Sequence, residues 1–315
     1  MKFTVEPLLD RPIIHQSQDK RLAGNVNGPS LIRVPAWVQN PLGAYYLYFA
    51  HHEGQSIRLA TADSLSGPWT IHWPGALTLE ASSYPATEPK QDDLHEETLY
   101  WISIDADGLY PHIASPDVIV DDERQEIRLY HHGRLVDGRQ RSRVAVSQDG
   151  LTFSPREALI GGPYMRMMQH QGVWYGLAMP GDLYRTEDGL TNFTEGHKLF
   201  TGTERHYALL KRGDQLIIFL TRIGDAPERI LASTVDISAE WTQWAASEPI
   251  EVHRATDKWE GAELAPTASL YGTCMVPVNQ LRDPAIFEED GEIYLLYAVQ
   301  GEQGIGIGRL IISAE

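Results

Sequence analysis

Acidic residues and one histidine that could transfer protons stand at the edges of short apolar segments. Asp117 directly follows a proline, Asp283 directly precedes one, and His206 follows an arginine. Glu263 belongs to a long polar segment that could fold over such residues. Carboxylates and imidazoles are the groups that most often act as general acids and bases. We therefore take Asp117, Asp283, Glu263 and His206 as the candidate catalytic residues.

Two pairs of adjacent histidines, His51–His52 and His131–His132, end two aromatic-rich segments that look equivalent. Adjacent residues of a strand point to opposite faces, so at most one histidine of each pair should face a common site. Imidazole can relay a proton, bind a hydroxyl group or bind a first-row metal ion. His51, His131 and His206 are therefore candidate ligands of a divalent metal ion. No short-range ligand motif such as HExxH supports this site.

These residues belong to a sequence unit that recurs along the chain. The unit consists of a short apolar strand, a turn, an aromatic-rich strand, an alternating strand and a closing strand with Trp or Phe. Its five copies begin near residues 27, 114, 164, 205 and 282. Two long inserts, near residues 76–112 and 244–281, interrupt the series and could wall one face of the structure.

The recurrence predicts an all-β fold, a five-bladed β-propeller that forms a single domain over residues 1–315. A β-sandwich with regularly spaced strands is the alternative. The last copy lacks a clear fourth strand. We expect the segment from Phe3 to Leu9 to supply it and to close the ring, which would cover an open sheet edge.

In a propeller the first strand of each blade lines the central channel, so the residues that open those strands converge on one funnel. The opening pairs are Asn27 with Ser30, Ser115 with Asp117, Tyr164 with Arg166, Arg205 with His206, and Arg282 with Asp283. Together with the ends of the second strands, they predict a polar binding site. The candidate substrate-binding residues are Asn27, His51, His52, His131, His132, Arg166, Arg222 and Arg282.

Composition narrows the class of partner. The 315 residues include 26 basic and 43 acidic side chains, a formal net charge of −17. Such a surface repels nucleic acid and anionic membranes, although arginines near the funnel would allow a small anionic substrate. A single cysteine, Cys274, excludes an intramolecular disulfide bond. No apolar leader or long apolar stretch is evident, so we expect a cytoplasmic location.

Two segments carry a resemblance to a known group of enzymes. Residues 60–69, Ala-Thr-Ala-Asp-Ser-Leu-Ser-Gly-Pro-Trp, resemble the blade signature of glycoside hydrolase family 43 and of its relatives in families 32, 117 and 130. Residues 282–287, Arg-Asp-Pro-Ala-Ile-Phe, are similar to their inner-strand pattern. The resemblance implies a five-bladed propeller in which three acidic residues from different blades act on a glycosidic bond. Asn27-Gly28-Pro29 and Ser115-Pro116 stand where that pattern has aspartates, so the acidic triad is not reproduced.

Three functions follow as hypotheses. The first is an exo-acting glycoside hydrolase that binds an oligosaccharide end and uses carboxylate and histidine acid–base chemistry. The second is a lyase or isomerase with a histidine-bound divalent metal ion and a small anionic or sugar-derived substrate. The third is a carbohydrate-binding propeller without catalysis.

Overall fold

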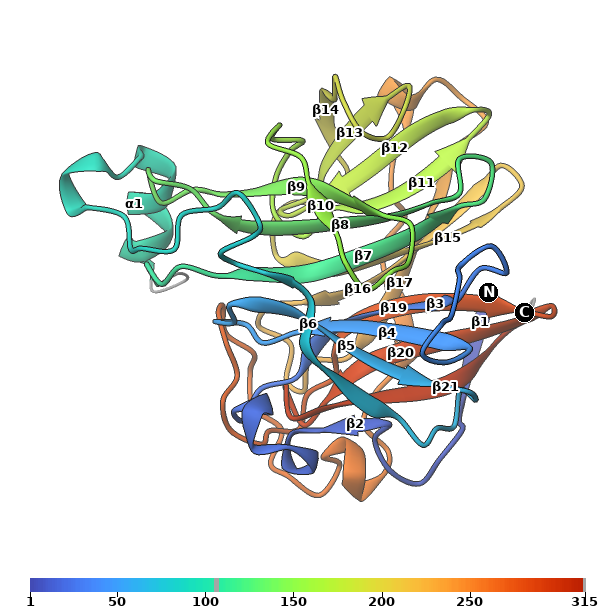
Figure 1. Ribbon diagram of the computed structural model, residues 1–315. Helices are drawn as coiled ribbons and strands as arrows, with labels where there is room; N and C mark the ends of the chain where they lie inside the picture. The colour runs from blue at the N-terminus through green and yellow to red at the C-terminus, as the bar shows by residue number, and fades with distance from the viewer. Residues whose placement is uncertain (105–107, 314–315) are drawn as a thin grey trace.

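Five antiparallel sheets surround a central axis in the computed structural model, which describes residues 1–104 and 108–313 (Figure 1). Four sheets have four strands, and the fifth also carries the short strand β2. This is a single-domain five-bladed β-propeller, as the recurrence of the sequence unit predicts.

The blades follow one another along the chain, each beginning with its innermost strand. Blade 1 contains β3 (Asn27–Arg33), β4 (Tyr45–Ala50), β5 (Ser56–Ala62) and β6 (Thr70–Thr78). Blade 2 contains β7 (Ile113–Asp121), β8 (Glu126–Arg134), β9 (Gln140–Ser147) and β10 (Ser154–Pro155). Blade 3 contains β11 (Arg166–His170), β12 (Val173–Ala178), β13 (Asp182–Thr186) and β14 (Thr194–Lys198).

Blade 5 joins the two ends of the chain. Blade 4 contains β15 (Glu204–Arg212), β16 (Gln215–Arg222), β17 (Ile230–Asp236) and β18 (Ile250–His253). Blade 5 contains β19 (Arg282–Glu289), β20 (Glu292–Val299), β21 (Gly304–Ser313), β1 (Lys2–Pro7) and β2 (Ile14–His15). Strand β1 pairs with β21 along its whole length, from Lys2 opposite Ser313 to Pro7 opposite Gly308. The predicted closure of the ring by the N-terminal segment is thus confirmed.

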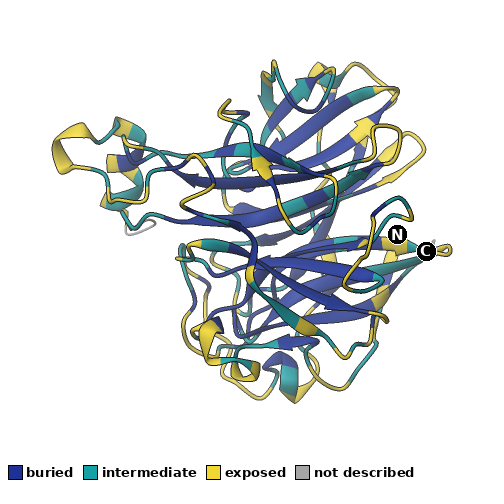
Figure 2. Cartoon of the chain, viewed as in Figure 1, coloured by how far each residue is buried: buried dark blue, intermediate teal, exposed yellow. Residues whose placement is uncertain are grey.

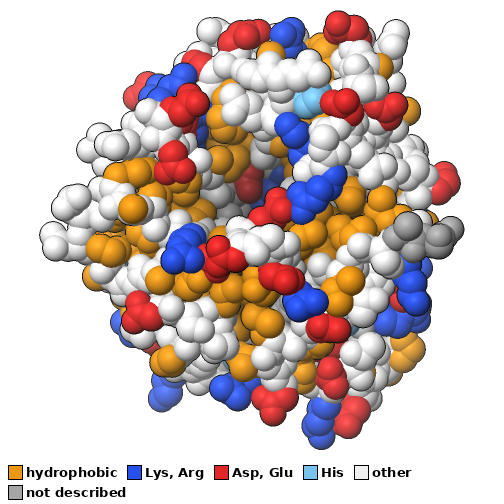
Figure 3. Space-filling view, turned by 90° about the vertical axis from the view of Figure 1, so that its right-hand side faces the viewer, with side chains coloured by type: hydrophobic (Ala, Val, Ile, Leu, Met, Phe, Trp, Pro, Cys, Tyr) orange, Lys and Arg blue, Asp and Glu red, His pale blue; other side chains and the backbone are white. Residues whose placement is uncertain are grey.

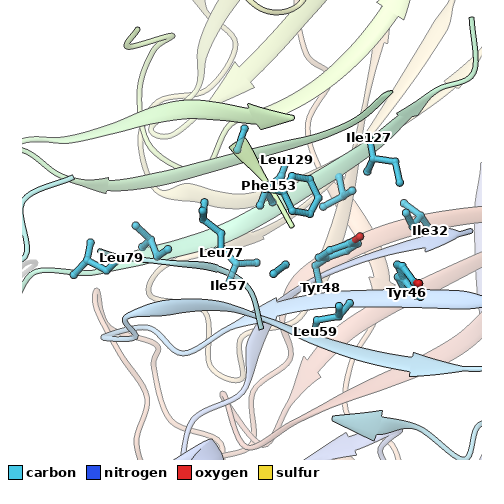
Figure 4. Packing of buried hydrophobic residues seen from close by; sticks show 14 of the residues in the cluster. Ile32, Tyr46, Tyr48, Ile57, Leu59, Leu77, Leu79, Ile127, Leu129 and Phe153 are labelled. Carbon is cyan, nitrogen blue, oxygen red and sulfur yellow. The ribbon is translucent and has the colours of Figure 1, made fainter. Parts of the chain in front are cut away.

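Apolar side chains on both faces of each sheet pack against the neighbouring blades. Figure 4 shows the contact between blades 1 and 2, where Tyr46 and Tyr48 of β4 meet Leu129 of β8 and Phe153. The Tyr48 hydroxyl also donates to the Gly150 carbonyl oxygen at 2.7 Å. Because both faces of a blade are buried, its strands read as nearly continuous apolar runs rather than as strict alternation.

The inserts hold most of the helical turns. The first contains the 3₁₀ turn η3 (Gln91–Asp93) and helix α1 (Glu96–Ser103), which projects from the ring and is largely exposed (Figures 1 and 2). The second contains η5 (Lys258–Glu260). The turn η4 (Trp241–Gln243) comes just before this insert, and η1 (Gln16–Gln18) and η2 (Lys20–Leu22) precede blade 1. Among the described residues, no helix has the length and hydropathy needed to cross a membrane.

The face opposite α1 is hollowed near its centre, with acidic and basic side chains around the hollow (Figure 3).

At the ends where they lead into their second strands, the inner strands are joined by ion pairs, Arg33 of β3 with Glu289 of β19 and Arg212 of β15 with Glu288. Three of these four side chains are substantially exposed, so each pair contributes little to stability. The buried polar groups instead gather at the opposite end of the strands.

Candidate active site

The same backbone irregularity opens the inner strand of every blade. At this point one residue per blade has a positive φ: Gly28 (56°), Ser115 (52°), Tyr164 (58°), His206 (57°) and Asp283 (49°). In four blades the strand register shifts across this residue, which marks a β-bulge. Four of the five residues are not glycine, and left-handed backbone at such residues is costly and concentrates at functional sites.

The five positive-φ positions and the residues beside them converge on one cavity of about 370 Å³. Its walls contain Asn27, Ala114, Ser115, Pro163, Tyr164, Arg205, His206 and Asp283 from the inner strands and the residues next to them. His52, His132, Gln140 and Met179 add to the wall, as do Gly108, Tyr110, Tyr271, Gly272 and Thr273 of the two inserts. The inserts therefore form part of the cavity wall, as expected from their length and position.

Asp283 is the single carboxylate among the residues that line the cavity. Its side chain is buried, and Oδ1 accepts a hydrogen bond from the Tyr164 hydroxyl at 2.7 Å. Burial, followed by the negative charge of Glu302, raises the pKa of Asp283 to about 6. A carboxyl group with this pKa exchanges protons near neutral pH and is suited to acid–base catalysis.

His206 lies beside Asp283, with Nε2 3.7 Å from Oδ1 of the carboxylate. Its other nitrogen, Nδ1, is 3.0 Å from the Thr221 hydroxyl, and its ring packs against Tyr164. Burial and the charges of Arg205 and Arg282 hold the pKa of His206 well below its usual range. His206 is therefore neutral and orients groups in the cavity rather than carrying charge.

A buried network of charges supports the floor of the cavity. Glu228 binds Arg205 through two hydrogen bonds of 2.9 and 2.7 Å and lies 3.0 Å from Nε of Arg282. Arg282 in turn donates to Glu302 at 2.9 Å. Burial would raise the pKa of each glutamate, but the neighbouring cations, including His52 beside Glu302, lower both below the usual range. These carboxylates stay ionised because each is paired.

His52 is a second titratable group of the cavity wall. Its Nδ1 is 3.6 Å from Oε2 of Glu302, which also accepts hydrogen bonds from Asn25 at 2.6 Å and Asn27 at 3.0 Å. Loss of water alone would lower the pKa of His52, but the negative charge of Glu302 outweighs that effect and raises it. The ring is therefore biased toward the imidazolium form.

One histidine of each pair lines the cavity, as expected, although only His131 and His132 lie within a strand. His52 and His132 line the cavity, and Nδ1 of His132 accepts a hydrogen bond from the Tyr164 backbone amide at 3.3 Å. His51 and His131 lie outside the lining, with His131 packed against Tyr84. Burial lowers the pKa of each of these two to about 4.

The two pairs are, however, not equivalent by position. The register places Ala50 opposite Asn27 and His132 opposite Ala114, so His51 and His52 lie one and two residues beyond the matching point. Since His51 and His131 lie outside the cavity lining, their binding of substrate stays a prediction. The proposed metal site of these two with His206 is not assembled, and no group of three potential ligands occurs among the described residues.

Asp117 and Arg166 join blades rather than lining the cavity. Asp117 Oδ2 accepts a hydrogen bond from the Met167 backbone amide at 2.8 Å, as Ser30 at the equivalent position accepts from Val118 at 2.9 Å. Arg166 donates to the carbonyl oxygens of Pro116 at 2.8 Å and Tyr207 at 2.9 Å. All three stand two residues beyond the bulge. Both residues thus connect neighbouring blades, and the catalytic role of Asp117 and the substrate-binding role of Arg166 stay predictions.

Three other predicted residues are displaced from the cavity. Glu263 is exposed and forms an ion pair with Lys258 at 3.1 Å. Arg222 is partly exposed, 3.5 Å from Glu204, and does not line the cavity. Arg282 lies beneath the floor, fully engaged with glutamates and Gln280. Arg222 ends β16, Arg282 begins β19 and Glu263 lies in the second insert, so position in the repeat did not by itself decide which of these side chains reach the cavity. Their predicted roles stay predictions.

Sequence reasoning missed Glu228 and Glu302, the two carboxylates that hold the network together. Both are in loops outside the repeated strands, before β17 and β21. It also missed Tyr110, Gln140, Tyr271 and Thr273 in the wall. The two arginines of the inner strands, Arg205 and Arg282, could have pointed to these glutamates. A buried arginine needs a carboxylate partner, and that partner can come from any part of the chain.

No protein-family model matches the chain. An uncharacterized protein of Acanthamoeba polyphaga mimivirus is 33% identical over 98% of this chain and 90% of the viral protein. The chain belongs to the same family as this viral protein.

Solved structures at much lower identity share the family's fold. A family-43 β-xylosidase/α-arabinofuranosidase from a compost metagenome, solved with xylotriose, has a TM-score of 0.60 at 14% identity, covering 99% of this chain and 96% of that enzyme. The family-43 enzyme of Xanthomonas citri with xylotriose has 0.57 at 13%, covering 98% and 90%. An α-L-arabinanase of Cellvibrio cellulosa with arabinohexaose has 0.54 at 14%, covering 92% and 93%. The family therefore has the propeller fold of glycoside hydrolase family 43.

Proposed function

We propose that this protein is a carbohydrate-active enzyme that hydrolyses a terminal glycosidic bond, with Asp283 as general base and His52 as general acid. The observation that carries the proposal is that one cavity holds two groups suited to proton transfer. One is the carboxyl group of Asp283, with a pKa of about 6, and the other is the imidazole of His52, whose pKa is raised by Glu302. The family-43 fold, whose solved examples bind xylotriose or arabinohexaose, supports a sugar substrate.

Asp283 would activate the attacking water. The Tyr164 hydroxyl donates a hydrogen bond to Oδ1 of Asp283, and no protein group among the described residues donates one to Oδ2. The free oxygen could accept a proton from water as that water attacks the anomeric carbon. The Tyr164 hydrogen bond fixes the orientation of the carboxylate, so little rearrangement is needed during the reaction.

His52 would protonate the departing oxygen. Its Nδ1 faces Glu302, which leaves Nε2 as the nitrogen available to a ligand in the cavity. The proton moves to the leaving oxygen as the glycosidic bond breaks, and the proton that Asp283 gains returns to solvent. Asn27, Ser115, His132 and Arg205 present hydrogen-bonding groups to the sugar hydroxyls. A cavity of about 370 Å³ that is walled by the inner strands and by both inserts favours the end of a chain over its middle.

The test is a pH–rate profile on xylo- and arabino-oligosaccharides, with released sugars measured by chromatography. Wild-type turnover should rise with a midpoint near pH 6, as Asp283 loses its proton, and fall at higher pH as His52 loses its own. Asp283→Asn should lower kcat by about 10²–10⁴-fold, the usual contribution of general catalysis. His52→Gln should lower kcat and remove the falling limb. Full turnover by Asp283→Asn would refute the assignment.

The single carboxylate of the cavity favours a second candidate, a sugar-binding propeller without turnover. Most glycoside hydrolases use two carboxyl groups, and here one lines the cavity. Calorimetric titration with the same oligosaccharides separates the two functions. Binding without product release, unchanged in Asp283→Asn, would select the binding protein over the enzyme.

A further inference from the structure

Three aromatic rings lead outward from the cavity in an unbroken row. Tyr271 of the second insert lines the cavity, and its ring centroid is 5.7 Å from that of Trp101 on α1. The Trp101 ring is 5.2 Å from that of Tyr100, which is 58% exposed. The row therefore joins the buried wall of the candidate active site to the outer surface.

Hydrogen bonds on both sides of Tyr271 fix its segment to the propeller. Ser269, two residues before Tyr271, exchanges backbone hydrogen bonds with the loop after β16, to Gly224 and Asp225 at 3.1 Å each. Beyond Tyr271, Asn25 donates to the Thr273 hydroxyl at 3.3 Å. The position of Tyr271 is thus set from both sides.

Helix α1 is anchored at its beginning and exposed at its end. The His95 amide and the Thr98 hydroxyl both donate to the Asp137 carbonyl oxygen, at 3.0 and 3.2 Å. Thr98 is its one buried residue. The helix therefore fills no core: most of it is exposed or half-buried (Figure 2), and Trp101 contacts Tyr271 of the cavity wall.

Exposed aromatic surface of this kind fits the face of a sugar ring. The C–H bonds of a pyranose point from its faces and carry partial positive charge, which the negative face of an aromatic ring attracts. Contiguous exposed apolar surface next to a pocket marks a ligand-binding groove. Preorganised rings bind without a further loss of side-chain entropy.

We propose that Tyr271 and Trp101 form a platform on which the second and third sugar rings of an oligosaccharide stack while its end occupies the cavity. The inference rests on the proposed function, since it assumes a sugar substrate. Tyr271, which lines the cavity, would take the second ring, and Trp101, farther out, the third. The substrate is then an oligosaccharide of at least three residues rather than a disaccharide.

The test measures kcat/KM on xylo- and arabino-oligosaccharides of two, three and four residues. For the wild type, kcat/KM should rise from disaccharide to trisaccharide. Trp101→Ala should lower it about 10-fold on the trisaccharide through KM and leave the disaccharide unchanged. Tyr271→Ala should lower it on both, whereas Trp101→Phe and Tyr271→Phe should retain most of the activity because they keep a ring.

Matched controls come from the neighbouring exposed residues. Leu99→Ala on α1 and Leu270→Ala beside Tyr271 remove apolar side chains that are 46% and 74% exposed, and should leave the length dependence unchanged. Equal losses at every length in Trp101→Ala, or no loss at any length, would overturn the platform while leaving the hydrolase intact. A wild type that neither cleaves nor binds any of these sugars would overturn the proposed function and the platform together.

Discussion

Blades 1 and 2 differ from blades 4 and 5 at one repeated position. The same left-handed bulge holds Gly28 and Ser115 in the first two blades, but His206 and Asp283 in the last two. Each of the charged blades also places an arginine directly before the bulge, Arg205 in blade 4 and Arg282 in blade 5. At this bulge position blades 4 and 5 thus supply titratable side chains, whereas blades 1 and 2 supply small ones and contribute their titratable groups, His52 and His132, from the ends of their second strands.

The difference shows that the repeated strands place one residue of each blade at the cavity. The buried ion pairs behind these residues differ from blade to blade, and they decide which blades hold ionisable side chains there. The buried Arg205, in the cavity wall, and the buried Arg282, outside it, are stable because Glu228 and Glu302 pair with them. An unpaired buried charge would cost several kcal/mol, so the two loop glutamates and the two strand arginines must occur together. Blades 1 and 2 need no such partners, and their polar residues are free to join neighbouring strands.

The largest expected effect is a loss of stability in blades 4 and 5, the charged half of the ring, which holds Arg205 and Arg282. Glu228→Gln leaves Arg205 and Arg282 short of a negative partner in a fully buried place, so we expect a loss of about 3–5 kcal/mol in the free energy of unfolding. Urea denaturation followed by fluorescence measures it. Glu263→Gln is the matched control, because its exposed pair with Lys258 should contribute about 0–1 kcal/mol. Equal effects of the two substitutions would show that the network does not hold the charged half together.

An intermediate effect is expected in blade 2. Asp117→Ala removes the acceptor of the Met167 amide and should reduce stability by about 1–3 kcal/mol. Because Asp117 lies outside the cavity lining, kcat and KM should remain within about 3-fold of the wild type at a temperature where both are folded. A large loss of kcat with an unchanged thermal transition would restore Asp117 as a catalytic residue and blur the contrast between the halves.

The smallest effect is a stability change at Asp283 with a distinctive pH dependence. Its pKa in the folded protein, about 6, is above the value of the unfolded chain, so the folded state binds the proton more tightly. The contribution of Asp283 to stability is therefore fully present below about pH 4 and is lost as pH rises through 6. Asp283→Asn should melt above the wild type at pH 7.5, and this advantage should disappear at pH 4. A variant that melts lower at pH 7.5 would contradict the assignment of Asp283 as a strained, functional carboxylate.

Much of the fold could be predicted from particular residues. The recurrent order of strand types predicts five blades, and the missing fourth strand of the last copy predicts closure by the N-terminal segment that pairs with β21. Asn27, His52, His132, His206 and Asp283 were correctly expected at the cavity, because each stands at or next to the end of an inner or second strand. Asp117 was also expected at the cavity but does not line it. It lies two residues after the positive-φ residue Ser115, and its side chain contacts the next blade instead.

The sequence by itself determined the propeller, its closure and the strand ends at which polar side chains converge. These follow from local periodicity, which constrains each strand through its own residues. Only the tertiary structure decided which carboxylates serve the site, because Glu228 and Glu302 reach it from loops whose course no periodicity specifies. Only the tertiary structure, likewise, brought Trp101 and Tyr271 together from inserts far apart in the chain. Distances across a ring of blades depend on how the blades pack, and that information is not present in any one segment.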